Sequence, residues 1–162
     1  MSELTHIDDK GRVRMVDVTQ KKPSRRTAVA QAMVHMTAET FQRIVTGAVS
    51  KGNVLETARI AGVMAAKKTA DLIPMCHPLN LTHVQVDFFP DAAIHAIRIE
   101  GTARIVDLTG IEMEALTAVS VAALTLYDMC KAIDKAMTIT DICLLKKSGG
   151  KSGTFTRKAP SP

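Results

Sequence analysis

Aromatic side chains are scarce in this chain. Its 162 residues include no Trp, one Tyr and four Phe, and aromatic residues make up 3% of the sequence. Proteins that bind single-stranded nucleic acids stack the bases on aromatic rings, so the scarcity counts against such a surface. The formal net charge of +5 still favours an anionic partner, and charge alone leaves nucleic acid and a phosphorylated metabolite open.

Cysteines and long apolar runs are few as well. The three cysteines are Cys76, Cys130 and Cys143, and the absence of C-x-x-C spacing favours reduced thiols over a disulfide framework. The N-terminus lacks the apolar stretch of a secretion signal, and no run approaches the ~18 apolar residues of a membrane span. We therefore expect a soluble cytoplasmic protein.

The hydrophobic content is sufficient for one globular domain. Hydrophobic residues make up 46% of the chain and charged residues 23%. We expect a single domain over residues 1–162, with an N-terminal extension at about 1–24 and a flexible C-terminal tail at about 148–162.

Apolar periodicity predicts an α+β fold. The expected elements are strands at 26–36, 83–89, 93–106 and 138–147, with long helices at 53–72 and 111–137. A short strand at 15–18 and a short helix at 37–47 are expected in addition. Two helices between four strands in this order indicate a ferredoxin-like βαββαβ sandwich with both helices on one sheet face.

Each long helix has a feature that bears on packing. In the first, Ala61–Gly62 and Ala65–Ala66 would let another backbone approach closely. In the second, apolar residues form one stripe, and a mixed face opposite suggests a subunit interface, a site wall or a solvated surface. The core stripe is Leu116, Val119, Ala123, Leu126, Tyr127, Cys130, Ile133 and Met137; the mixed face is Glu114, Thr117, Val121, Leu124, Asp128, Lys131 and Lys135.

The stretch GGKS near the C-terminus resembles the end of a phosphate-binding P-loop, but its surroundings do not fit. Leu145 stands where a P-loop needs glycine, and too few residues follow Ser152 to form the required helix. The pattern is more typical of a Gly/Ser-rich tail with solvated lysines.

The sequence MCHP at Met75–Pro78 follows the expected end of the first long helix. His77 can transfer protons near neutral pH, and with Cys76 it could form part of a zinc site, although no further ligands show suitable spacing. A histidine in a loop is also commonly a plain surface residue. Lys67 could simply pair with Asp71 at i+4.

Three long strings carry a family resemblance: KGNVLETARIAGVMAAKKTADLIPMCHPL, GIEMEALTAVSVAALTLYDMCKA and LLKKSGGKSG. In this order they closely resemble the cyclic pyranopterin monophosphate synthase family of molybdenum-cofactor biosynthesis. The resemblance implies a lyase that converts 3′,8-cyclo-7,8-dihydro-GTP, made by an upstream radical GTP cyclase, into cyclic pyranopterin monophosphate and diphosphate. It also implies a homohexamer, a trimer of dimers with each pocket between two subunits.

The same resemblance implies a set of site residues. Asp128 is the matching catalytic position, and we expect Lys51 and Lys131 to be the principal catalytic lysines. The expected substrate contacts are Lys67, Met75, Cys76, His77, Glu112, Met113 and Glu114, with Lys147 and Lys151 as candidate contacts from the tail. Met75 stands where the family more often has Leu, a change of similar volume.

The implied chemistry explains these residue types. Ring opening needs a proton donor and an acceptor, which Asp128 with Lys131, or His77 with Glu112 or Glu114, could supply. Lysines would stabilise the charge that moves onto the departing diphosphate. No metal site or cofactor follows from the sequence, and magnesium with the triphosphate stays open.

Two other classes remain alternatives. A basic ferredoxin-like nucleic-acid binder would need exposed aromatics on its sheet, but only Phe88 and Phe89 are available, and adjacent strand residues face opposite ways. A metabolite-sensing oligomer would bind the anion without turnover. Neither membrane nor nucleic acid is an expected partner.

Overall fold

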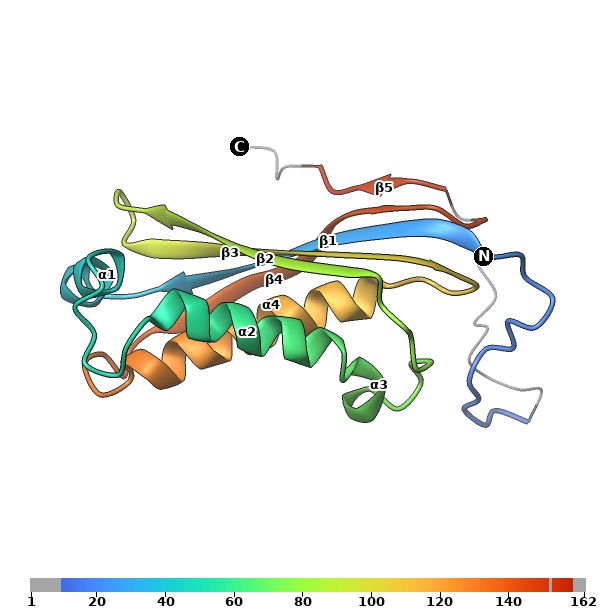
Figure 1. Cartoon of the computed structure of the whole chain (residues 1–162), viewed down its shortest axis with the longest axis horizontal. Coiled ribbons are helices and arrows are strands. Elements are labelled where there is room, and N and C mark those ends of the chain that lie inside the picture. Colours follow the sequence, from blue (N-terminus) through green and yellow to red (C-terminus); the bar gives the residue numbers. More distant parts are fainter. Residues whose placement is uncertain (1–9, 152, 159–162) are drawn as a thin grey trace.

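The secondary structure begins at Ser24 in the computed structural model, which describes residues 10–151 and 153–158. The elements are β1 (Ser24–His35), α1 (Ala38–Val45), α2 (Val54–Ala66), α3 (Thr69–Leu72), β2 (His83–Asp91), β3 (Ala96–Asp107), α4 (Glu112–Cys130), β4 (Thr138–Ser148) and β5 (Phe155–Thr156). The antiparallel sheet has the order β2-β3-β1-β4-β5, and α2 and α4 cover one of its faces (Figure 1). The predicted ferredoxin-like α+β fold is confirmed.

Two details of the strands differ from the prediction. The expected strand at 15–18 does not form, because this segment has no ladder partner and only Val13 makes an isolated bridge. The β2–β3 pairing runs on through Pro90 and Asp91, so the turn lies at 92–95. Proline is tolerated there because β2 is an edge strand, where its missing N–H faces no partner.

The first long helix is divided in two. It begins as predicted, with Asn53 Oδ1 accepting a hydrogen bond from the Glu56 N–H at 3.1 Å. It ends at Ala66, earlier than predicted. The hydroxyl of buried Thr69 donates a hydrogen bond to the Ala66 carbonyl oxygen at 3.0 Å, and α3 starts at Thr69. The helix expected over 53–72 is therefore interrupted at Lys67 and Lys68, and the prediction of one continuous helix is wrong.

The second long helix is also shorter than predicted, ending at Cys130 and not near Met137. The Asp134 carboxylate accepts hydrogen bonds from the Thr37 and Ala136 N–H groups, each at 2.9 Å, and holds the chain in a turn. Burial of Asp134 fixes this turn between α4 and β4.

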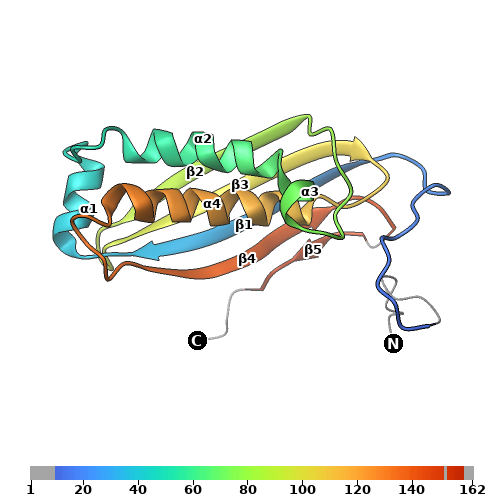
Figure 2. The same cartoon turned by 90° about the horizontal axis from the view of Figure 1, so that it is seen from below.

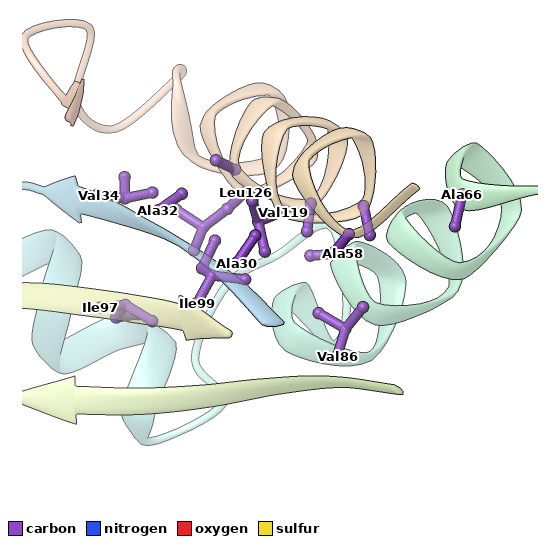
Figure 3. Packing of buried hydrophobic residues seen from close by; sticks show 14 of the residues in the cluster. Ala30, Ala32, Val34, Ala58, Ala66, Val86, Ile97, Ile99, Val119 and Leu126 are labelled. Carbon is purple, nitrogen blue, oxygen red and sulfur yellow. The ribbon is translucent and has the colours of Figure 1, made fainter. Parts of the chain in front are cut away.

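The core lies between the sheet and the two long helices, where Val34, Ile97, Ile99, Val119 and Leu126 are all buried (Figure 3). It depends on close backbone approach. A Cβ at Gly62 would lie 2.8 Å from the Ala118 carbonyl oxygen, which confirms the expected close packing of α2 on another backbone.

The helices run antiparallel across the sheet (Figure 2). The start of α4 lies beside α3, and its end lies at the same end of the molecule as α1 (Figures 1 and 2). By length and composition α4 could cross a membrane, but half of that stretch is buried inside the protein, as in a core helix. The two ends of α4 hold different groups of chemically active side chains.

Candidate functional site

A cluster of two lysines and one aspartate, here the lysine cluster, lies at the C-terminal end of α4. The Lys131 Nζ is 2.7 Å from the Asp128 Oδ1, and the Lys51 Nζ donates to the Asp128 backbone oxygen at 3.0 Å. The structure thus brings together all three residues expected to be catalytic. Their side chains are exposed and accessible to a ligand.

Helix geometry explains the composition of the lysine cluster. The last carbonyls of a helix lack partners within it and carry partial negative charge, so lysines are stabilised there. The hydrogen bond and charge of Lys131, with a further contribution from Lys51, lower the pKa of Asp128. The same hydrogen bond and the Asp128 charge raise the pKa of Lys131. The aspartate is therefore ionised and the lysine protonated at neutral pH.

A cavity of about 370 Å³, the acid cavity, lies at the opposite end of α4. It is lined by the 75–77 loop and by the first turn of the helix, which supplies Glu112, Met113 and Glu114. The N-terminal segment adds Val16 and Lys21. Most of the predicted substrate-binding residues therefore share one cavity.

Glu114 is the most perturbed acid of this cavity. Glu114 is 3% exposed, although it lines this cavity together with the 75–77 loop. Burial, with a smaller contribution from the Glu112 charge, raises the pKa of Glu114 to about 7. Burial and the Glu114 charge also raise the pKa of the Cys76 thiol. Glu114 can thus exchange a proton near neutral pH, whereas Cys76 stays a neutral thiol.

A larger cavity of about 780 Å³, the basic cavity, adjoins the acid cavity. The two share Lys21, Thr109, Gly110 and Glu112 as lining residues. The remaining charged lining residues are all cations: Lys22, Arg26, Lys147 and Lys151. Lys147 and Lys151, the two lysines proposed from the tail, therefore both line the basic cavity. The 75–77 loop and the first turn of α4 line the adjoining acid cavity.

Glu112 stands at the boundary of the two cavities. Its Oε1 lies 2.9 Å from the Lys147 Nζ, and both side chains are 27% exposed. Its carboxylate folds back over Gly110, in the space that a Cβ at that position would occupy. Glycine at position 110 thus permits the observed position of Glu112.

Lys21 and Arg26 were missed by the sequence analysis. Arg26 is fixed by donating from Nε to the Asp107 carbonyl at 3.0 Å and from Nη2 to the Leu108 carbonyl at 2.9 Å. The local signal was the run KKPSRR, which places four cations within six residues. Which cavity that run would line depends on the packing of β1 against β3.

Two expectations about neighbouring residues need correction. Asp71 pairs with Lys68 at 3.3 Å and not with Lys67, which is exposed at the end of α2. Glu114 and Thr117 do not belong to an outer mixed face, because both are buried. Only Asp128, Lys131, Lys135 and Leu124 of that face are exposed.

The tail differs from a P-loop as predicted. Gly149, Gly150 and Gly153 have positive φ values, and the short strand β5 follows instead of a helix in the described residues. β5 pairs with β4, with Lys147 opposite Phe155. Mobility of the tail stays a prediction.

The alternatives gain no support from the geometry. Phe88 packs against the core, whereas exposed Phe89 lies under the Arg98 guanidinium at 4.1 Å, so the two rings offer no joint stacking surface. In the described part of the chain, no group of three His, Cys, Asp or Glu side chains is placed to hold a metal ion.

The lysine cluster and the acid cavity are far apart in one chain. Sixteen residues of α4 separate Glu112 from Asp128, and at a rise of 1.5 Å per residue this is about 24 Å. A substrate of nucleotide size does not bridge that distance while bound in a single pocket.

Comparison with known proteins gives a consistent family assignment. A profile of the MoaC family matches residues 15–150. The chain is 66% identical to the cyclic pyranopterin monophosphate synthase of Desulforapulum autotrophicum, covering 96% of this chain and 95% of that protein. Proteins of the same name from Desulfatibacillum aliphaticivorans and Roseiflexus sp. are 62% and 61% identical, over 98% and 96% of this chain and 99% and 98% of theirs.

Proposed function

Because the chain belongs to the MoaC family, we propose that it converts 3′,8-cyclo-7,8-dihydro-GTP into cyclic pyranopterin monophosphate and releases diphosphate. The observation that carries this proposal is the adjacency of the two cavities. A buried acid with a pKa of about 7 lines one cavity. Five cations line the other, where Glu112 is the only acid among the described lining residues. The two adjoining cavities suit a substrate that has a ring system with exchangeable protons at one end and phosphates at the other.

The basic cavity is where we place the triphosphate. Lys147 and Lys151 approach from the tail, and Lys21 and Arg26 from the N-terminal side. Cations around phosphate oxygens stabilise the charge that develops on departing diphosphate. Closure of the SGGKSG turn over bound phosphates would complete this cavity and remains part of the proposal.

The acid cavity is where we place the guanine-derived ring. His77 and Glu114 line it, and Glu114 can donate or accept a proton near neutral pH, while Met75 and Met113 supply apolar contact. Ring opening requires protonation of a departing nitrogen, which a neutral Glu114 can perform.

The lysine cluster must come from another subunit if it acts on the same substrate. The separation of about 24 Å along α4 excludes one pocket within one chain, so we propose that a second copy supplies Lys51, Asp128 and Lys131. A homohexamer built as a trimer of dimers provides such a partner. Asp128 keeps Lys131 charged and positioned, and the two lysines contact the reacting groups.

The cellular setting follows from the chemistry. We place the enzyme in the cytoplasm, where its free cysteines stay reduced, and downstream of a radical GTP cyclase that supplies the cyclised intermediate. The chain's own residues account for the acid–base steps without a cofactor. Magnesium could accompany the triphosphate as part of the substrate.

The test uses the purified cyclised intermediate and follows release of diphosphate and formation of the cyclic phosphate product. We expect turnover by the wild-type protein and a loss of at least ~100-fold in kcat for Lys51→Ala, Lys131→Ala and Asp128→Ala. Lys68→Ala is the matched control, because this exposed lysine pairs with Asp71 and lines neither cavity. Binding of the intermediate without diphosphate release would instead support a metabolite sensor.

A further inference from the structure

The sheet face opposite the helices carries a cavity of about 620 Å³, here called the sheet-face cavity. In the part of the chain that the structure describes, α2 and α4 lie on the other face (Figure 1). The sheet therefore separates this cavity from the core and from the acid cavity. None of its lining residues belongs to the candidate active site.

Strand register explains why cations gather there. Thr27 is paired with Arg104 on one side and with Ser148 on the other. Arg25 is two residues from Thr27 on the same strand, and Lys146 is two residues from Ser148. Residues two apart on a strand share a face, so Arg25, Arg104 and Lys146 surround the Thr27 hydroxyl from three strands, and all line the cavity.

These three cations have no carboxylate to offset them. None of the residues that line the cavity is acidic. Of the acids nearby on β2 and β3, Glu100 binds Arg98 at 2.7 Å, and Asp87 accepts from Gln85 at 2.7 Å. Within the described residues, no ion pair forms to Arg25, Arg104 or Lys146. Like charges at neighbouring positions on one sheet face repel each other, which destabilises the empty protein.

A histidine on the edge strand β2 also lines the sheet-face cavity. His83 is paired with Arg104 across β2 and β3 and lines the same cavity. Its Nε2 is buried and has no hydrogen-bond partner in the described chain. The Thr27 and Ser148 hydroxyls add further donors to the same site.

We propose that the sheet-face cavity is a second anion site, which binds a small phosphate-bearing anion of the size and charge of diphosphate. Two arginines present planar donor pairs that match phosphate oxygens, and one lysine adds a point charge. The site lies across the sheet from the basic cavity, so it can be occupied while substrate is bound. Diphosphate bound in the sheet-face cavity would not contact the substrate or the residues of the candidate active site.

The experiment is calorimetric titration of the full-length assembly with inorganic diphosphate, without substrate. We expect two classes of site, one in the basic cavity and one in the sheet-face cavity. The double variant R25Q/R104Q should weaken the second class by about tenfold or more and leave turnover of the cyclised intermediate unchanged. Lys147→Met should weaken the first class only.

The matched control is Arg98→Gln, which removes a cation from the same strand and face but outside the cavity, where Glu100 already offsets it. It should leave both classes of site unchanged. Lys146→Met provides a second single-site probe if R25Q/R104Q fails to fold by circular dichroism.

The proposal would be overturned if the titration showed a single class of diphosphate site and Lys147→Met removed it entirely. An isotherm of R25Q/R104Q equal to that of the wild type would overturn it too. A change of oligomeric state in R25Q/R104Q with unchanged diphosphate binding would show that another copy covers this face, and would also overturn it. Because binding is measured without turnover, these outcomes do not depend on the proposed reaction.

Discussion

Lys147 and Glu112 form an ion pair of 2.9 Å that joins the last long strand to the first turn of α4. Glu112 lines both adjoining cavities, and its charge contributes to the raised pKa of Glu114. A phosphate that binds Lys147 would compete with this pair. Binding of the substrate's phosphates to Lys147 is thereby coupled to the charge of Glu112, which lies near the buried Glu114.

Lys147→Met tests the role of this lysine in phosphate binding. We expect a rise in KM of about tenfold or more, because a charge-assisted contact to phosphate is lost. Lys158→Met is the control, since this exposed lysine of the same tail lines neither cavity. Equal KM values for the two variants would contradict a role of Lys147 in holding the phosphates.

Gly110→Ala tests whether the position of Glu112 matters. The added methyl group occupies the space of the Glu112 carboxylate, which must move away from Lys147. We expect kcat/KM to fall to about the level of Glu112→Ala, while the thermal midpoint changes little. The double variant G110A/E112A should be no worse than Glu112→Ala, because both changes act on one group. Additive losses would show that Gly110 acts through something else.

Glu114 gives a prediction for stability against pH. Its pKa is about 7 in the folded protein and near the ordinary 4.5 when unfolded. Between these values the folded state holds more protons than the unfolded state, so the free energy of unfolding falls as pH rises from 4.5 to 7 and levels off above. The contribution is at most roughly 3 kcal/mol.

Glu114→Gln should remove that slope, because glutamine stays neutral across the range. Chemical denaturation at several pH values measures it, and Glu39→Gln, an exposed acid paired with Arg43 on α1, is the control that keeps the slope. If both variants show the wild-type slope, burial does not raise the pKa of Glu114.

Local patterns predicted much of this structure. The start of the first long helix at residue 53, the close approach at Gly62 and the Asp128–Lys131 pair follow from residue types a few positions apart. The end of α4 was misplaced because it depends on a distant partner: Asp134 reaches back to the Thr37 N–H, nearly a hundred residues earlier in the chain.

The site was predicted in composition but not in arrangement. The family resemblance named residues at both ends of α4, while periodicity placed Glu114 on an outer face and could not show that it is buried. The Lys21 and Arg26 contributions to the basic cavity depend on β1 pairing with β3, which carries Arg26 to the Asp107 carbonyl. Such long-range placement has no local signature.

The central claim is that one active site is built from two copies of the chain. Its most direct test mixes two inactive variants, Lys131→Ala from the lysine cluster and His77→Ala from the acid cavity, by joint unfolding and refolding. Random pairing makes half of the dimers mixed, and each mixed dimer contains one intact pocket and one doubly defective pocket. We predict recovery of roughly a quarter of the wild-type activity. A mixture as inactive as each variant alone, with mixed oligomers demonstrated by mass spectrometry, would contradict the account.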